Sequence, residues 1–197
     1  MSVRCAWVPP TDPLYCAYHD EEWGVAEAEP QALWEKLVLD GMQAGLSWIT
    51  ILRKRETIRA AFANFDPEKV ARFDETDMER LLNDAGIIRS RAKCQATIDG
   101  AKIFLDMRDK GEDFSHYMWG FVDGKPLQNS WASLAQVPSK TELSEVITKD
   151  LKSRGFKFCG PVIVYAFMQA VGMVNDHTVD CHCYEPVRNA GFDINQT

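Results

Sequence analysis

Apolar positions along the chain recur at intervals of three and four residues, the spacing that places side chains on one face of a helix. The clearest example follows Pro30, because proline suits the first turn of a helix, where its missing N–H leaves no bond unmade. The apolar face of this predicted helix consists of Leu33, Trp34, Leu37 and Val38. A second helix is predicted from Trp48 to the cationic run at residues 53–55.

Helix-start and helix-stop residues divide the rest of the chain into further helices. Asp66 and Pro67 predict an N-cap and a first turn, and residues 76–79 fit a capping box with Gly86 as the stop. Other helical patterns cover residues 91–110, 114–121, 141–154 and 161–172. Residues 129–138 are predicted to form a loop, and no stretch shows a convincing strand alternation. The predicted fold class is all-α.

Composition sets limits without naming a function. The 197 residues suffice for one domain or a tightly joined pair, and 46% hydrophobic with 26% charged residues is ordinary for a globular protein. The net charge of −7 argues against a nucleic-acid partner unless a local basic patch compensates. The pattern contains no secretory or membrane-spanning segment, so we expect a cytoplasmic protein. The six cysteines are then expected to be thiols or metal ligands rather than disulfides.

A short connection between two predicted helices supplies such a basic patch. Residues 152–161 carry Gly155 and Gly160 near the two ends of a turn, with Lys157 between them. Glycine lets a ligand approach the backbone closely, and the following helix N-terminus presents unpaired N–H groups to an anion. The segment fits a helix-hairpin-helix that binds the DNA backbone by its phosphates. An ordinary pair of helices with a solvated cationic rim fits the same residues.

Cysteines and histidines lie in pairs near both ends of the chain. Cys5 and His19 lie near the beginning, and His177 and Cys181 lie four residues apart near the end. Two thiolates and two imidazoles make a closed tetrahedral zinc set, which would clip the chain ends together. Buried thiols and hydrogen-bonded histidines explain the pattern equally well. The neighbours that compete for places in this set are Cys16, His182 and Cys183.

Aromatic residues crowd the first quarter of the chain, which also holds Asp40. They are Trp7, Tyr15, Tyr18, Trp23, Trp34 and Trp48. Aromatic rings on opposite walls can sandwich a planar base, more strongly when the base is cationic, while a carboxylate accepts hydrogen bonds from the base edge. An aromatic core with Asp40 capping a helix end or exposed is the alternative. Trp34, on the apolar face of its helix, is expected to belong to the core.

Read in order along the chain, these segments resemble 3-methyladenine DNA glycosylase I. The motifs that carry the resemblance are Cys-x-Trp at 5–7, Asp-Pro-Leu-Tyr at 12–15, Tyr-His-Asp-x-Glu-Trp-Gly-Val at 18–25, Gln-Ala-Gly-Leu-Ser-Trp at 43–48, Asp-Ala-Gly-Ile-Ile-Arg at 84–89, Arg-Gly-Phe-Lys-Phe at 154–158 and Phe-Met-Gln-Ala-x-Gly-x-Val-Asn-Asp-His at 167–177. The match runs from Cys5 to about Tyr184, nearly the whole chain.

The resemblance implies a fold similar to the helix-hairpin-helix glycosylases. Residues 1–184 would form one glycosylase unit of two helical lobes, and residues 185–197 a C-terminal tail that matches nothing. The implied ligands of one structural zinc ion per chain are Cys5, His19, His177 and Cys181. The implied base pocket consists of a carboxylate with Trp7, Tyr18, Trp23 and Trp48. The residues implied to contact DNA are Gln43 and Leu46, which probe the gap left by a flipped nucleotide, and Gly155, Lys157 and Gly160 of the hairpin.

The resemblance also implies the reaction, which is hydrolysis of the N-glycosidic bond of 3-methyladenine in alkylated double-stranded DNA. Methylation at N3 makes the base cationic and a good leaving group, so little acid catalysis is needed. The family usually has glutamate at position 40, and Asp40 reaches one methylene less far. Asp40 is predicted to select the base and stabilise cationic charge, with Tyr18 as a further contact. No lysine nucleophile is identified, so a monofunctional enzyme is predicted. The enzyme is also expected to be a monomer.

Two other functions fit parts of the same sequence. A zinc hydrolase would use His177, Asp180 and Cys181 around an open metal site, and chelation would remove its activity but not its fold. A binding module would hold alkylated or mismatched DNA without releasing a base. An assay for free 3-methyladenine separates these functions from a glycosylase.

Overall fold

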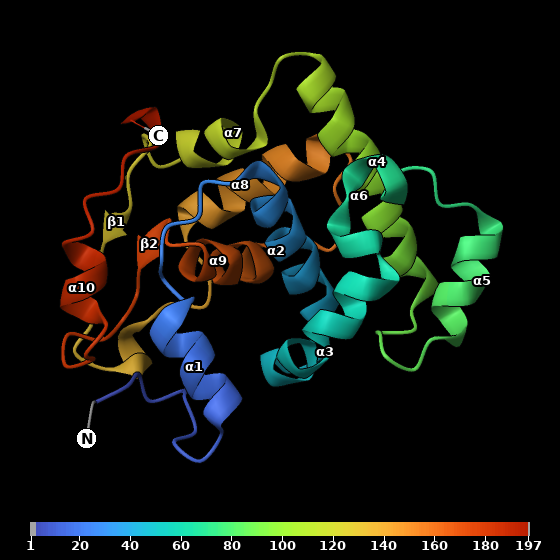
Figure 1. Ribbon diagram of the computed structural model, residues 1–197. Coiled ribbons are helices and arrows are strands. Elements are labelled where there is room, and N and C mark those ends of the chain that lie inside the picture. Colours follow the sequence, from blue (N-terminus) through green and yellow to red (C-terminus); the bar gives the residue numbers. More distant parts are fainter. Residues whose placement is uncertain (1–2, 197) are drawn as a thin grey trace.

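The computed structural model describes residues 3–196 and is mostly helical (Figure 1). Its elements in chain order are α1 (Pro13–Glu21), α2 (Pro30–Gln43), α3 (Trp48–Ala61), η1 (Ala63–Phe65), α4 (Pro67–Val70), α5 (Glu75–Asn83), α6 (Arg91–Asp109), α7 (Phe114–Gly120), β1 (Leu127–Gln128), η2 (Leu134–Gln136), α8 (Glu142–Ser153), α9 (Pro161–Ala170), β2 (Val174–Asn175), α10 (Tyr184–Arg188) and η3 (Ile194–Gln196). The strands β1 and β2 pair in parallel. The sequence analysis predicted no strand, because two residues are too few to show an alternation.

Proline after an N-cap residue begins four of these helices, namely α1, α2, α4 and α9. The prediction at Asp66 is confirmed, since its side chain accepts hydrogen bonds from the first turn of α4. The same signal at Asp12 begins α1, a helix that the sequence analysis did not predict. Asp12 accepts a hydrogen bond from the backbone N–H of Tyr15 at 3.2 Å. This helix matters because it carries Tyr18 and His19.

Three predicted helix boundaries were wrong. α3 continues to Ala61, well past the cationic run at residues 53–55, because charged side chains on the solvent face do not interrupt a helix. The capping box of α5 is formed by Asp74 and Asp77, two residues before the predicted one. α5 then ends at Asn83 rather than at Gly86.

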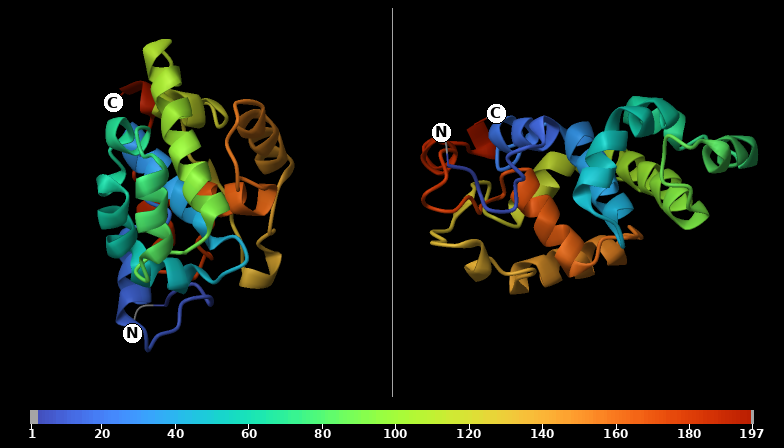
Figure 2. Two further views of the ribbon diagram at one scale, coloured as in Figure 1. Left: turned by 90° about the vertical axis from the view of Figure 1, so that its right-hand side faces the viewer. Right: turned by 90° about the horizontal axis from the view of Figure 1, so that it is seen from below.

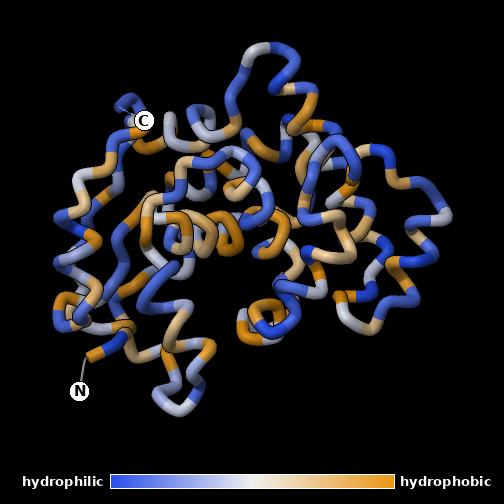
Figure 3. The backbone as a smooth tube through the Cα atoms, viewed as in Figure 1, coloured by the Kyte–Doolittle hydropathy of each residue, from blue (hydrophilic) through white to orange (hydrophobic). Residues whose placement is uncertain are grey.

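The helices α2 and α9 pack against each other in the middle of the molecule (Figure 1). Helices α3 to α6 lie on one side of them. The two ends of the described chain lie on the opposite side, well separated from each other, as Figure 1 and Figure 2 show. Hydrophobic residues predominate along the central helix α9, whereas the outlying α5 is largely hydrophilic (Figure 3). Trp34 on α2 is fully buried, which confirms its predicted place in the core.

The C-terminal segment packs onto the body of the protein. The ring centroid of Phe192 lies 4.4 Å from that of Trp119 on α7, and Ile194 is buried. Lys125 forms an ion pair with Asp193 at 3.3 Å. Residues 185–196 are therefore part of the folded unit, although they match none of the motifs found in the sequence. Within residues 3–196, no helix is long and apolar enough to cross a membrane.

Candidate active site and metal cluster

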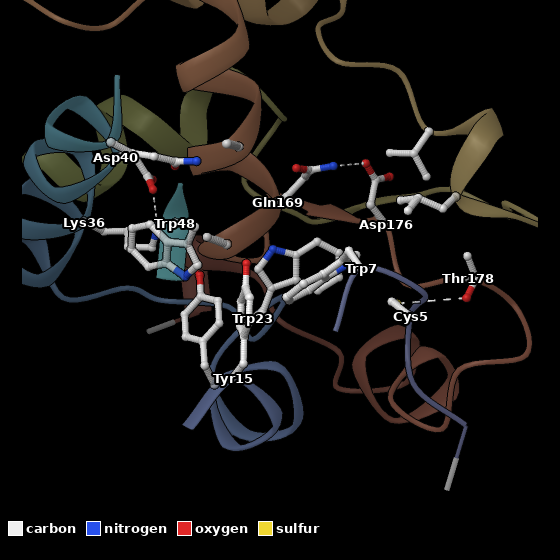
Figure 4. A pocket seen from close by; sticks show the side chains of 16 residues that line it. Cys5, Trp7, Tyr15, Trp23, Lys36, Asp40, Trp48, Gln169, Asp176 and Thr178 are labelled. Atoms are coloured by element: carbon white, nitrogen blue, oxygen red, sulfur yellow. Dashed lines mark hydrogen bonds and ion pairs between the residues drawn. The ribbon is translucent and has the colours of Figure 1, made fainter. Parts of the chain in front are cut away.

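A cavity of about 250 Å³ lies where α1, α2 and α9 meet the N-terminal segment (Figure 4). All five residues predicted for the base site line it, namely Trp7, Tyr18, Trp23, Asp40 and Trp48. These residues come from the N-terminal segment, α1, the connection between α1 and α2, α2 itself and the first turn of α3, so folding brings them together from separate elements. The cavity is therefore the candidate active site.

Aromatic rings form the walls of this cavity. The ring centroids of Trp7 and Trp23 are 5.1 Å apart, and those of Tyr18 and Trp48 are 5.4 Å apart. Tyr15 adds a fifth ring 5.3 Å from Trp7, a residue that the sequence analysis named but did not assign to the site. Tyr18 and Trp23 are buried, whereas Trp7 and Trp48 keep part of their surface exposed. Packing thus holds the rings in place around the space that they enclose.

A buried ion pair occupies the α2 side of the cavity. Nζ of Lys36 lies 2.5 Å from Oδ1 of Asp40, one helical turn further along. Asp40 is 1% exposed, and its Oδ2 has no hydrogen-bond partner among residues 3–196. Burial raises the pKa of Asp40 and lowers the pKa of Lys36, and attraction between the two charges offsets part of each shift. Lys36 also lies over the Trp48 ring, 4.1 Å from its centroid.

Lys36 changes the electrostatics that the sequence analysis expected at Asp40. The expectation included stabilisation of a cationic base, but an ammonium at 2.5 Å cancels most of the field of the carboxylate. Asp40 still offers Oδ2 as an acceptor. The sequence analysis missed Lys36, since lysine and aspartate four residues apart are common on exposed helix surfaces. The available signal was its position among apolar neighbours on α2.

A second carboxylate, Asp176, lines another side of the cavity. It accepts hydrogen bonds from Tyr165 Oη at 2.7 Å, Gln169 Nε2 at 2.8 Å, Asn129 Nδ2 at 2.6 Å and Trp131 Nε1 at 2.8 Å. Neutral donors therefore saturate this carboxylate, so it fixes neighbouring side chains rather than offering a free acceptor. Gln169 also lines the cavity, and both residues lie in a motif that carried the resemblance without being assigned a role.

The loop between α2 and α3 carries the two residues predicted to enter the duplex. Gln43 lines the cavity, whereas Leu46 is 42% exposed. Lys93 on α6 donates hydrogen bonds to the backbone oxygens of Met42 at 2.8 Å and Ala44 at 2.7 Å, which anchors the loop. An exposed apolar side chain beside the cavity suits the predicted wedge. Contact of Gln43 and Leu46 with DNA stays a prediction.

Both ends of the chain contribute to one buried cluster of possible metal ligands, formed by Cys5, His19, His177 and Cys181. Their ligand atoms all lie within 4.8 Å of one another. Sγ of Cys181 lies 3.5 Å from both His19 Nε2 and His177 Nδ1, and Sγ of Cys5 lies 3.5 Å from His177 Nδ1. Tetrahedral bonds of about 2.0–2.3 Å place neighbouring ligand atoms about 3.3–3.8 Å apart. The four side chains therefore have the spacing of a tetrahedral metal site.

The contacts around the two histidines fit the same interpretation. Nδ1 of His19 lies 2.8 Å from Oδ1 of Asp20, and Nε2 of His177 lies 3.1 Å from the backbone oxygen of Trp23. Such outer contacts orient the ring and leave the other nitrogen available to a metal. Cys16 and Asp180 belong to no group of potential ligands within residues 3–196. The described ligand groups therefore provide no site of the kind that the zinc-hydrolase alternative required.

The predicted hairpin connects α8 and α9. Gly155 follows α8 with a φ of +102°, and a Cβ there would lie 3.2 Å from Cδ1 of Ile103. The backbone conformation and this close contact therefore explain the glycine without a ligand. Gly160 is the N-cap of α9 with a φ of −68°, and a Cβ there would meet no atom of the described chain within 4 Å. Lys157 is 58% exposed, and its Nζ lies 3.1 Å from Oδ2 of Asp99. Their contact with DNA stays a prediction.

Comparisons with known sequences agree on one family. The model of the methyladenine glycosylase family matches residues 7–184. DNA-3-methyladenine glycosylase 1 of Escherichia coli is 53% identical over 181 residues, which cover 92% of this chain and 96% of that protein. DNA-3-methyladenine glycosylase of Haemophilus influenzae is 48% identical over 183 residues, which cover 93% of this chain and 98% of that protein.

Comparisons with solved structures give the same result. A crystal structure of 3-methyladenine DNA glycosylase I matches with a TM-score of 0.91 and 52% identity. The match covers 92% of this chain and 100% of the other. The 3-methyladenine DNA glycosylase I of Staphylococcus aureus, studied for the structural basis of 3-methyladenine recognition, matches with a TM-score of 0.88 and 36% identity. That match covers 92% of this chain and 96% of the other.

Proposed function

This chain belongs to the methyladenine glycosylase family, and we propose that it releases 3-methyladenine from alkylated double-stranded DNA by flipping the nucleotide into the cavity beside Asp40. The relatives named above are DNA-3-methyladenine glycosylases, enzymes that hydrolyse an N-glycosidic bond. The observation that carries the proposal is Oδ2 of Asp40, a buried acceptor with no partner within residues 3–196, in a cavity walled by aromatic rings.

The aromatic walls bind the base by its faces. The base in 3-methyladenine nucleotides is cationic, so stacking between rings such as Trp7 and Trp48 gains a cation–π contribution. Oδ2 of Asp40 accepts a hydrogen bond from the exocyclic amino group on the base edge, and Tyr18 adds a further contact. A normal adenine lacks the positive charge, so it gains less from the rings and leaves the sugar less readily.

Cleavage of the N-glycosidic bond needs little help from an acid. The departing base keeps the electron pair of that bond, which neutralises its positive charge. Water then attacks the sugar carbon, and an abasic site remains. We propose a monofunctional enzyme although Lys36 lines the cavity. The contact with Asp40 at 2.5 Å favours the protonated amine, which is not a nucleophile.

The hairpin and the exposed Leu46 are the proposed contacts to the duplex. The first residues of α9 present backbone N–H groups to a phosphate, in the manner of a helix-hairpin-helix, and Lys157 adds a positive charge. Leu46 fills the gap left by the flipped nucleotide and replaces part of the lost stacking. No base-specific contact is needed for this binding mode, and a single chain supplies every part of it, so we propose a monomer.

We propose that one structural zinc ion is bound by the terminal cluster. Cys5, His19, His177 and Cys181 would occupy all four places of a tetrahedral zinc, so the ion would hold the two ends of the chain together without binding a substrate. The ion would also fix His19, whose ring stacks on Trp23 with centroids 6.1 Å apart. The cluster thereby supports one wall of the cavity.

Metal analysis and a matched pair of variants test the zinc site. The purified protein is expected to contain one zinc per chain, and Cys181→Ser to lose it together with roughly several kcal/mol of folding free energy. Cys183→Ser is the control, because Cys183 is buried next to the cluster but is absent from the four-ligand set. A protein that melts at the same temperature with and without a chelator would contradict the structural role.

Release of free 3-methyladenine from methylated DNA tests the proposed activity. The wild type is expected to release the base, and Asp40→Asn to release it at least about 100-fold more slowly, the loss typical of a buried group that acts in the reaction. Asp40→Glu keeps the carboxylate and serves as a second, folded variant that retains activity. Asp106→Asn is the matched control, because Asp106 pairs with Lys110 on the exposed surface of α6. Equal rates for wild type and Asp40→Asn would refute the role of Asp40.

A further inference from the structure

Lys93 on α6 holds the end of α2, the helix that carries Asp40, without lining the aromatic cavity. Its ammonium donates hydrogen bonds to the backbone oxygens of Met42 at 2.8 Å and Ala44 at 2.7 Å. The last carbonyl groups of a helix have no N–H partner within that helix, and negative partial charge gathers there. The last turn of α2 contains no basic residue of its own. Lys93 therefore supplies, from another helix, both the donors and the positive charge that this helix end needs.

The same lysine lies against the hairpin that is proposed to bind phosphate. Its Nζ lies 5.9 Å from the centroid of the Phe158 ring. A Cβ on Gly41 of α2 would lie 3.3 Å from both the Cβ and the backbone oxygen of Phe158, so the hairpin backbone rests directly on α2. Lys93, Gly41 and Phe158 all line one small space between α2, α6 and the hairpin. The end of α2 and the hairpin are therefore joined at Lys93.

The loop after α2 has little packing of its own to set its position. Its apolar tip residue, Leu46, is 42% exposed. Gly45 has a φ of +79°, and a Cβ there would meet no atom of the described chain within 4 Å. The loop therefore depends on the place where it leaves α2, and Lys93 fixes that place through the oxygens of Met42 and Ala44.

We propose that Lys93 is a positioning residue for the reaction, which holds the loop of Leu46 at a fixed place relative to the phosphate-binding hairpin. Leu46 then enters the duplex beside the nucleotide whose backbone the hairpin binds. Without Lys93 the hairpin would still bind phosphate and the cavity would still bind the base. Leu46 would replace the lost stacking less well, so the flipped state would form less readily. This inference rests on the proposed glycosylase function.

Binding to two duplexes of the same sequence measures the positioning. One duplex is undamaged, and the other contains a stable abasic-site analogue, which offers the gap without a base. Lys93→Met is expected to lower the preference of the wild type for the abasic duplex about tenfold or more, since two hydrogen bonds from a charged donor are lost. Its affinity for the undamaged duplex is expected to stay unchanged. Lys93→Arg keeps the charge and the donors, and it is expected to restore most of the preference.

Lys54→Met is the matched control for the loss of a lysine. Lys54 is partly exposed like Lys93, and its Nζ also donates to a backbone oxygen, that of Ala85 at 2.7 Å. It contacts neither the end of α2 nor the hairpin, so the preference for the abasic duplex is expected to stay at the wild-type value. Release of 3-methyladenine from methylated duplex is expected to fall about tenfold or more in Lys93→Met and to stay unchanged in Lys54→Met.

Binding of free 3-methyladenine shows whether the cavity of each variant is intact. Tryptophans line the cavity, so quenching of their fluorescence reports its occupancy. Lys93→Met is expected to bind the free base as the wild type does, and weaker binding would overturn the positioning role in favour of a general role in the fold. An unchanged preference between the duplexes would also overturn it, and so would equal weakening of both, which indicates a direct phosphate contact. A wild type that binds the free base but releases none from methylated DNA overturns the proposed function instead.

Discussion

Two pairs of lysine and aspartate, each four residues apart in the chain, have almost the same contact but different surroundings. Lys36 and Asp40 on α2 are 2.5 Å apart, and Asp106 on α6 is 2.6 Å from Lys110, the C-cap residue of that helix. The side chains of the first pair are 16% and 2% exposed, and those of the second are 66% and 61% exposed. Water screens the charges of the second pair. The ions of the first pair have lost most of their hydration, and they contact each other and the aromatic residues of the cavity.

This difference decides what each pair can do. An exposed pair contributes little to stability, because both ions are already well solvated in the unfolded chain. A buried pair loses hydration that its mutual attraction does not fully restore, and unsatisfied atoms remain to bind a ligand. Oδ2 of Asp40 is such an atom. The buried pair is therefore retained at some loss of stability, as expected for a functional site.

Neutralising each pair in turn gives the largest expected effect. Lys36→Gln/Asp40→Asn removes two desolvated charges and is expected to raise the free energy of unfolding by about 1–2 kcal/mol, while base release falls at least about 100-fold. Lys110→Gln/Asp106→Asn is the matched control, and it is expected to leave both stability and activity unchanged. Denaturant titration and the base-release assay measure the two effects. A loss of stability in the buried double variant would show that the ion pair is a stabilising contact.

The pH dependence of stability sharpens this result. Because the pKa of Asp40 is raised in the folded protein, the wild type loses stability relative to the buried double variant as pH rises through that pKa. Because the pKa of Lys36 is lowered, the wild type regains stability as pH rises from that pKa toward the ordinary value of 10.5. The stability gap between double variant and wild type is expected to be widest between these two pKa values. A gap that does not change with pH would refute this assignment.

The overall helical pattern was readable from the sequence because its signals are local. Proline after a capping residue and apolar spacing on α2 depend on residues within a few positions of one another. The pairing of β1 with β2 was not readable, because its two strands are two residues long and far apart in the chain. Lys36 was missed for a related reason, since only the packing of α3 and α9 against α2 turns an ordinary helical charge into a buried one.

The contact between the Cys/His cluster and the aromatic cavity could be seen only in the structure. The sequence analysis treated the Cys/His pairs as scaffold and the aromatic residues as the base site. In the folded chain the two regions touch, since Cys5 lines the cavity and the ring centroids of Trp23 and His177 are 4.6 Å apart. A change at the cluster is therefore transmitted to the wall of the cavity, a coupling that residue spacing does not reveal.

A third lysine–aspartate pair gives the smallest expected effect and extends the comparison to the DNA surface. Nζ of Lys157 lies 3.1 Å from Asp99, and the two side chains are 58% and 31% exposed. An exposed ammonium can exchange a screened carboxylate for a phosphate at little cost, which the buried Lys36 cannot do. Lys157→Gln is therefore expected to leave stability and base selectivity unchanged and to weaken DNA binding only a few-fold. Its signature is the salt dependence, because one lost phosphate contact lowers the slope of log K against log salt by about 0.9.

Binding of an undamaged duplex at several salt concentrations measures that slope without interference from catalysis. Lys110→Gln removes an exposed ammonium from the distant end of α6 and is expected to keep the wild-type slope. If Lys157→Gln also keeps the wild-type slope, Lys157 makes no phosphate contact. The proposed binding of DNA by the hairpin then depends on the backbone N–H groups of α9 alone. Gly160→Ala separates these two contributions, because the added methyl meets no described atom within 4 Å and so affects binding only if a phosphate lies against the backbone there.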